Sequence, residues 1–258
     1  MTHICKKEVV VNGLTISKEQ IISSIRNTNK YLNDISLYFE ELELEIFHIL
    51  GQRNISGLIG EVFSRFLEKD VASLRSNPHQ DGRPDLLNIQ SQKSKDYFRY
   101  SFLDDGEKYP IKSRFSPYPH GGIEVKCTIG DSRSVKKEVK AKLLSQKYGV
   151  DVFDVNIPRI DLFGGITYWA HHQDCSSLLG IYYDYYDKQK FNPQIISLFY
   201  TELEKSDWYD ISVGNIDSKK TSNTSLRPSG KEKIKNGLVA IIDDERYSEV
   251  LKGRGYTF

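Results

Sequence analysis

Gly122-Ile-Glu-Val-Lys-Cys-Thr-Ile129 alternates apolar and polar side chains along its length. A period of two predicts a β-strand whose odd-numbered residues face the core, while Glu124 and Lys126 share the other face. About 6.6 Å of strand separates these two charged residues, so both can reach the same small ligand. Cys127 falls on the apolar face and is expected to pack there rather than to react. The plainer interpretation is an exposed Glu–Lys pair on an ordinary amphipathic strand.

The first third of the chain is predicted to be mainly helical. Ser17 opens a capping-box pattern, and apolar residues follow at helical spacing. A second helix is expected over Asp34–Leu50, ended by Gly51. A third is expected over about Ser56–Asp70, and its wide apolar pattern places it deep against a sheet. Its conspicuous polar residue is Glu61.

Further strands and helices alternate along the rest of the chain. Interleaved elements of this kind predict an α/β (α+β) fold, with a central mixed β-sheet flanked by helices and a helical N-terminal part. A length of 258 residues is ample for a buried core. Besides residues 122–129, strands are expected at 85–89, 166–170, 177–184 and 238–242, and helices at 134–148 and 193–205.

Composition bounds the class of protein. The chain is 38% hydrophobic and 28% charged, a composition typical of a globular protein. Its net charge of +1 does not by itself indicate a nucleic-acid partner. Three cysteines without a CxxC spacing argue against a disulfide framework and a structural zinc. The N-terminus lacks an apolar signal core, and no run approaches the ~20 apolar residues of a membrane span. We therefore expect a cytoplasmic protein that does not contact a membrane.

A second acidic group precedes the strand, in the turn Arg83-Pro-Asp85. Two carboxylates and a lysine at one sheet edge suit magnesium-dependent phosphodiester hydrolysis, because Mg²⁺ prefers a few carboxylate oxygens together with waters and a substrate phosphate. Asp85 and Glu124 are the candidate ligands, with the Val125 carbonyl as a third donor. Lys126 is expected beside the attacking water, which it would orient or deprotonate.

The pairing of Pro84-Asp85 with Glu124-Val125-Lys126 resembles the PD-(D/E)XK nuclease superfamily, most closely a type II restriction endonuclease. The resemblance extends over about residues 56–186. It implies a restriction-endonuclease-like core, Mg²⁺ dependence, and cleavage of both strands of duplex DNA at a short specific sequence to leave 5′-phosphates. It also implies a role for Glu61, which matches an additional catalytic glutamate on the helix before the first motif.

The spacer between Asp85 and Glu124 is long for this family. If it is not an insertion, Asp81, Asp104 or Asp105 replaces Asp85 as the metal ligand. On this interpretation the chain divides into an N-terminal helical region (1–55), a catalytic core (56–190) and a C-terminal part (191–258). The C-terminal part would complete the core and contribute a basic DNA-contacting segment at 217–237.

The expected partner is double-stranded DNA. A palindromic target implies a homodimer, because matching half-sites require matching subunits. A cognate DNA methyltransferase is expected as a functional partner rather than a bound subunit. Basic and amide side chains in two segments are candidates for contacts to phosphates and base edges. The candidates are Arg133, Lys136, Lys137, Lys219, Lys220, Asn223, Arg227 and Lys231.

Other interpretations remain open from the sequence. A nuclease directed to damaged or branched DNA would use the same residues, and a non-catalytic DNA-binding protein would bind DNA without a metal. His171 and His172 do not predict a zinc site, because adjacent residues of a strand face opposite sides and no third ligand lies at a useful spacing.

Overall fold

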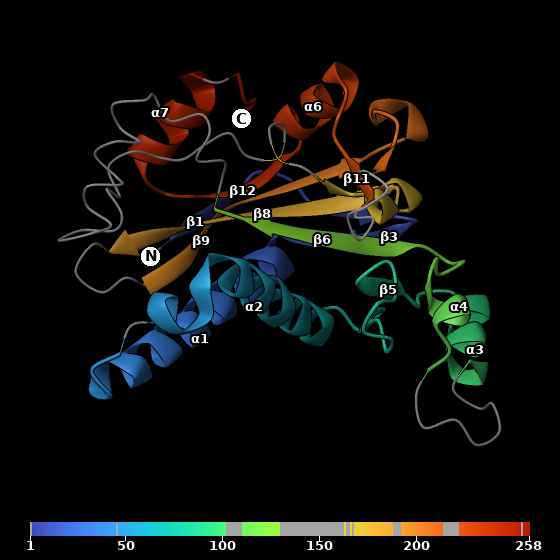
Figure 1. The fold of residues 1–258 in the computed structure, drawn as a ribbon, viewed down its shortest axis with the longest axis horizontal. Helices are drawn as coiled ribbons and strands as arrows, with labels where there is room; N and C mark the ends of the chain where they lie inside the picture. Colours follow the sequence, from blue (N-terminus) through green and yellow to red (C-terminus); the bar gives the residue numbers. More distant parts are fainter. Residues whose placement is uncertain are drawn as a thin grey trace.

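A computed structural model of the chain describes residues 2–44, 46–101, 110–129, 163, 166, 168–187, 192–213, 222–253 and 255–258. Within these residues, seven strands form one mixed sheet (Figure 1). Only β6 and β8 pair in parallel, and the other neighbours are antiparallel. The predicted mixed sheet flanked by helices is therefore confirmed. In order across the sheet, the strands are β1 (His3–Cys5), β12 (Leu238–Ile242), β9 (Asn192–Glu202), β8 (Ser177–Asp187), β6 (Gly122–Thr128), β5 (Leu86–Asn88) and β4 (Leu74–Ser76).

Two long helices, α1 (Lys18–Glu41) and α2 (Ile46–Asp70), cover one face of the sheet (Figure 1). The predicted capping box is confirmed, since Ser17 and Gln20 satisfy each other's backbone N–H groups. The predicted break at Gly51 is wrong, because α2 runs through it. Its apolar face, which includes Ile59 and Phe63, is fully buried. Packing of that face outweighs the roughly 1 kcal/mol that a glycine costs inside a helix.

The opposite face carries α6 (Pro228–Lys235), α7 (Glu245–Gly253) and a small sheet (Figure 1). The small sheet has the order β10 (Ser212–Val213), β11 (Ser222–Thr224), β7 (Tyr168–Trp169). The strand expected over 166–170 is thus short, and the 3₁₀ helix η2 (Ala170–Asp174) follows it directly. A second 3₁₀ helix, η3 (Lys205–Asp207), connects β9 to this layer.

The helix expected over 193–205 is wrong, because these residues form most of β9. Helices cover both faces of the sheet, so nearly every residue of β9 is buried. Ile195 and Leu198 join the core beneath α1 and α2, whereas Ile196 and Phe199 join the core beneath α6 and α7. A strand buried on both faces is continuously apolar, and its sequence lacks the alternation that separates strands from helices.

Smaller elements lie at the margins of the sheet. The hairpin β2 (Val9–Val11) and β3 (Leu14–Ile16) precedes α1, while α3 (Gln92–Tyr100) and α4 (Lys112–Phe115) lie beside β5 (Figure 1). The helix expected over 134–148 lies outside the described residues. None of the described helices is long and apolar enough to cross a bilayer. All three cysteines are free thiols, as their spacing predicts.

Candidate active site

The site begins where β5 and β6 meet. Leu86 pairs with Ile123 and Leu87 with Gly122, so the antiparallel register sets Asp85 opposite Glu124 on one face. A Cβ atom on Gly122 would lie 2.0 Å from the carbonyl oxygen of Leu86, which only glycine avoids. The close approach of the two strands therefore brings together the two carboxylates that the sequence places 39 residues apart.

The Asp85 side chain is hydrogen-bonded to the backbone of β6. Asp85 Oδ2 accepts a hydrogen bond of 2.7 Å from the backbone N–H of Val125. The N–H and C=O of one strand residue point to the same side, so the Val125 carbonyl also faces the β5 edge. The side chains of Val125 and Cys127 pack into the core beneath α1 and α2, as the alternation predicts. The residues named as Mg²⁺ ligands therefore lie side by side where β5 meets β6.

Arg83 supplies positive charge to both carboxylates. Its Nε lies 3.4 Å from Glu124 Oε1, and its Nη1 lies 3.6 Å from Asp85 Oδ1. The Nε atom is buried and has no hydrogen-bond partner among the described residues. No role for Arg83 was predicted from the sequence, although Arg83 stands directly before the Pro84-Asp85 motif. The positive charge of one arginine therefore lies close to both carboxylates.

The electrostatics of the pair favour a bound cation. Burial, followed by the nearby charge of Asp85, raises the pKa of Glu124 to about 8. Burial also raises the pKa of Asp85, and Glu61 adds to that rise, whereas the Val125 N–H, Arg83 and Lys126 oppose it. Ionising both carboxyl groups at neutral pH therefore costs free energy that Arg83 offsets only in part. A divalent cation would remove that cost, and oxygen donors are the ligands that Mg²⁺ prefers.

A cavity of about 820 Å³ opens beside this edge, between α2, residues 76–82 and β6. Glu61, Asp85 and Lys126 all line it. Three of the residues predicted from the motif and from the preceding helix therefore border one cavity, whereas Glu124 is not among the residues that line it. On the far side of β6, Lys126 Nζ lies 5.8 Å from the ring centroid of Tyr168.

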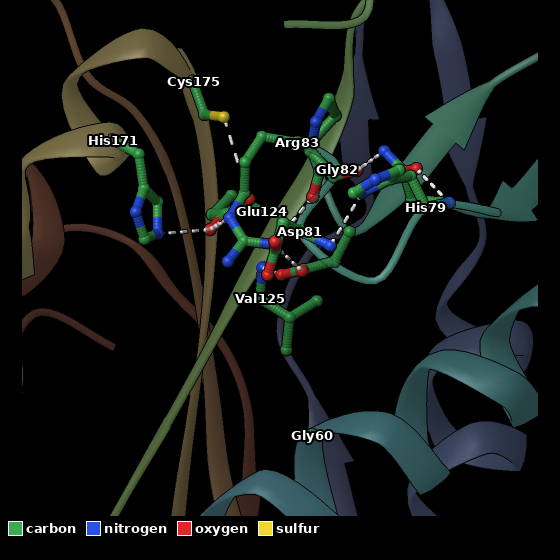
Figure 2. A network of polar contacts seen from close by, with 12 residues as sticks. Gly60, His79, Asp81, Gly82, Arg83, Glu124, Val125, His171 and Cys175 are labelled. Carbon is green, nitrogen blue, oxygen red and sulfur yellow. Dashed lines mark hydrogen bonds and ion pairs between the residues drawn. The ribbon is translucent and has the colours of Figure 1, made fainter. Parts of the chain in front are cut away.

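The two histidines behave differently from the prediction. They belong to η2 rather than to a strand, so their rings lie on the same side and stack with centroids 4.5 Å apart. Nε2 of His171 lies 3.7 Å from Glu124 Oε1, and Nε2 of His172 lies 3.8 Å from the same atom. The expectation that no third ligand accompanies these histidines is wrong. Figure 2 shows His171 and Cys175 on one side of Glu124, and the loop that carries His79 and Gly82 on the other.

Burial dominates the protonation of these imidazoles. It lowers the pKa of His171 to about 4, with the charges of Arg83 and Lys126 acting in the same direction. It lowers the pKa of His172 to about 3. Cys175 donates a 3.7 Å contact from its thiol to Glu124 Oε2, and burial raises the pKa of that thiol. At neutral pH the groups facing Glu124 on this side are therefore uncharged.

Of the three alternative metal ligands, Asp81 is the one that the described part of the chain contains. Its carboxylate is 70% exposed and pairs with Lys112 Nζ at 3.7 Å rather than with Arg83, which lies beside Asp85 and Glu124. Asp104 and Asp105 lie outside the described residues. Of the two described candidates, Asp81 and Asp85, it is therefore Asp85 that lies beside Glu124 and can share a metal ion with it.

The candidate DNA contacts are placed only in part. Arg133, Lys136, Lys137, Lys219 and Lys220 lie outside the described residues. Asn223 belongs to β11, where it pairs with Trp169 and Ser212. The Nε of Arg227 donates 2.7 Å to the carbonyl of Trp208, and its guanidinium lies over the ring of Tyr209. Lys231 is exposed on α6.

No family model, curated protein or solved structure matches this chain. Its function therefore has to be inferred from the chemistry that Asp85, Glu124, Lys126 and their neighbours can perform together.

Proposed function

We propose that the protein is a Mg²⁺-dependent endodeoxyribonuclease of the PD-(D/E)XK type, acting as a type II restriction endonuclease. The observation that carries the proposal is the register of β5 on β6, which sets Asp85 opposite Glu124, with Lys126 two residues further along β6. Glu61 and Lys126 border the same cavity as Asp85. These are the groups that hydrolysis of a phosphodiester needs.

Asp85, Glu124 and the Val125 carbonyl would hold the cation. Mg²⁺ bound there would supply Lewis-acid stabilisation of charge on the phosphate oxygens. The hydrogen bond from the Val125 N–H to Asp85 Oδ2 fixes one carboxylate oxygen and leaves Oδ1 for other partners. Arg83 lies close enough to both acids to hold them together before a cation binds.

Lys126 is suited to act on the nucleophile. It lines the cavity and lies near enough to Asp85 to lower the pKa of that carboxyl group. An ammonium in this position orients a water molecule and offsets the negative charge that develops on the phosphate. Glu61, which lines the cavity from α2, would position a water molecule or a second hydrated cation.

The substrate and partners follow from the same proposal. Duplex DNA would enter with a phosphate at the cavity, and a homodimer would present two such sites to a palindromic sequence. Arg227, Lys231 and Asn223 would contribute to binding, together with the basic residues outside the described part. A methyltransferase would protect the host sequence. The three-part division at residues 55 and 190 belongs to this proposal, although α2 runs across the first boundary.

Plasmid cleavage tests the proposal directly. The wild-type chain is expected to linearise supercoiled plasmid with Mg²⁺ and to be inactive in EDTA. Asp85→Asn and Lys126→Met are each expected to lower the rate by about 10²-fold or more, since each removes a group acting on the transition state. Asp81→Asn and Lys112→Met are the matched controls, because they remove a nearby exposed pair of the same charges. Both controls are expected to stay within about threefold of wild type.

Two outcomes would contradict parts of the proposal. If folded Asp85→Asn and Lys126→Met proteins cut as fast as wild type, the site is assigned to the wrong residues. The product distinguishes the biological role, because a restriction enzyme gives discrete fragments from intact duplex. Cutting confined to branches, nicks or ends would instead indicate a repair or recombination nuclease.

A further inference from the structure

Three potential ligand atoms converge beside β6 on the side away from α2. The Nε2 atoms of His171 and His172 lie 3.7 and 3.8 Å from Oε1 of Glu124, and one potential ligand atom from each of the three residues lies within 4.8 Å of the other two. The side chains of Glu124 and His172 are 3% and 4% exposed, and that of His171 is 34% exposed. The group is therefore mostly buried, and only the His171 ring reaches solvent. An ion could enter the site beside that ring.

The hydrogen bonding of His172 fixes which nitrogen faces Glu124 as an acceptor. Its Nδ1 lies 3.0 Å from the carbonyl oxygen of Trp169. A carbonyl only accepts, so Nδ1 carries the proton and Nε2 presents a lone pair in the neutral ring. The Nε2 lone pair and the carboxylate oxygen, 3.8 Å apart, are both acceptors. They therefore attract each other only when a cation or a proton lies between them. Metal-binding histidines are oriented by this kind of backbone hydrogen bond.

The rings are also held in place by packing. The two imidazoles stack at an interplanar angle of 21°, and the ring of Tyr168 contacts His172 edge-on with centroids 5.3 Å apart. Both histidines lie on η2, a short 3₁₀ helix that follows β7 directly. The ligand atoms are therefore positioned before any ion binds.

We propose that Glu124, His171 and His172 form a binding site for a transition-metal dication of the Mn²⁺, Co²⁺ or Zn²⁺ class. Two imidazole nitrogens and one carboxylate oxygen suit such ions, whereas Mg²⁺ selects oxygen donors. Two ligands of a tetrahedral ion with bonds of about 2.1 Å lie roughly 3.4 Å apart, so separations of 3.7 and 3.8 Å need only a small closure. Waters would complete the coordination. The proposal concerns metal binding and does not depend on the nuclease assignment.

This site is distinct from the oxygen-lined edge at Asp85. Asp85, directly before the neighbouring strand β5, lies opposite Glu124, whereas the histidines approach Glu124 from η2, so its carboxylate can serve both positions. Arg83 Nε lies 3.4 Å from the oxygen that the histidines approach. A carboxylate has about four lone-pair sites, so Arg83 and an ion can bind the same group together. A nitrogen-containing site beside an oxygen-lined one would give the protein two cation positions of different selectivity.

Visible absorption of Co²⁺ tests the proposal without any activity assay, because the intensity and position of its bands report ligand type and number. We expect the wild-type protein to bind Co²⁺ with bands of nitrogen and oxygen ligation, and excess Mg²⁺ not to remove them. His171→Gln is expected to weaken binding about tenfold, and His171→Gln with His172→Gln about 100-fold or more. His171 is partly exposed, so the single variant tests the site even if the double variant unfolds.

Two further variants separate this site from its neighbours. Asp85→Asn is expected to leave the shape of the Co²⁺ bands unchanged, because Asp85 does not face the histidines. Cys175→Ser is expected to retain binding and thereby exclude the nearby thiol as the ligand. Unchanged Co²⁺ binding in the folded His171→Gln protein would overturn the proposal. So would loss of the bands in Cys175→Ser or in Asp85→Asn.

Discussion

Asp85 and Val125 are joined by a 2.7 Å hydrogen bond from the Val125 backbone N–H to Asp85 Oδ2. Val125 stands between Glu124 and Lys126, so this one bond ties the residue directly before β5 to the centre of the motif on β6. The position of the first carboxylate is thereby fixed by backbone rather than by another mobile side chain. Such fixed positions lower the cost of organising charged groups around a ligand.

Gly122→Ala should separate the two strands that carry the carboxylates. The added methyl group would meet the Leu86 carbonyl oxygen and the Pro84 ring, and backbone atoms cannot yield cheaply. We expect a loss of about 2–3 kcal/mol in the free energy of unfolding, measured in urea. Gly57→Ala is the control, because a Cβ there has no described atom within 4 Å and lies inside α2. That substitution should stabilise the protein by about 0.5–1 kcal/mol. Equal stabilities for the two variants would contradict the assigned strand contact.

Arg83→Gln should leave Asp85 and Glu124 without their shared cation. Arg83 lowers the pKa of both carboxyl groups, so both pKa values should rise in the variant. A ¹³C NMR titration of the Glu124 side chain measures this directly. Above pH 8 the variant should be about 1–3 kcal/mol less stable than wild type, since Arg83 is only 23% exposed and Glu124 3%. The control Arg65→Gln breaks a pair whose arginine is 63% exposed, and should change stability by less than about 0.5 kcal/mol.

Above about pH 7, where His171 and His172 are neutral in the folded and the unfolded states alike, the stability of the metal-free protein should fall as the pH rises toward 8. Glu124 has a pKa near 8 in the folded protein, well above its ordinary value of 4.5. Between these values the folded state holds a proton that the unfolded state has lost, so raising the pH favours unfolding. The slope from one such group is at most about 1.4 kcal/mol per pH unit. Urea unfolding in EDTA at several pH values measures it.

Glu124→Gln provides the comparison for that slope, because it keeps the shape of the side chain and cannot ionise. We expect its stability to change less with pH over the same range than that of wild type. A wild-type slope that Glu124→Gln leaves intact would assign the pH dependence to other groups.

Asp207→Asn should loosen the attachment of α6 to the sheet. Asp207 Oδ2 accepts hydrogen bonds from Lys233 Nζ at 2.6 Å and from the Glu204 N–H at 2.8 Å. Burial pushes the pKa of Asp207 upward, but these bonds outweigh it and hold the pKa below its ordinary value. The stabilisation is therefore present above about pH 4 and lost as the pH falls through the folded-state pKa.

We expect Asp207→Asn to lower stability by about 1–2 kcal/mol at pH 7 and to match wild type near pH 2, as followed by thermal or urea unfolding. Asp34→Asn is the control, since its pair with Lys30 is exposed on both sides and should contribute less than about 0.5 kcal/mol. A difference between Asp207→Asn and wild type that persists unchanged into acid would show that charge is not the cause.

Local signals predicted the elements that depend on local chemistry. The capping residues at Ser17 and the alternation of residues 122–128 needed no knowledge of distant segments, and both predictions are confirmed. Helices cover both faces of β9, so its sequence lacks the alternation of a half-exposed strand, and it was predicted to be a helix. The position of Gly51 in α2 likewise depends on packing that no window of sequence contains.

The candidate site divides in the same way. The motif spacing indicated Asp85, Glu124 and Lys126, whose proximity follows from one strand pairing. Arg83 was not predicted because its position depends on the path of the turn before β5. His171 and His172 were not predicted as ligands because a 3₁₀ helix, rather than a strand, carries them. A strand ending at Trp169 changes the angle between successive side chains from about 180° to about 120°, which turns both rings toward Glu124.

The pairing of β1 with β12 has a consequence for biosynthesis. His3 lies opposite Ile242, so the outer edge of the sheet cannot close until nearly the whole described chain has left the ribosome. The parallel neighbour of β6 and the imidazoles of η2 also emerge after Glu124. We therefore expect the sheet to form late in synthesis, and affinity for divalent ions to appear only after η2 and β8 have been made, so that shorter nascent chains do not bind these ions.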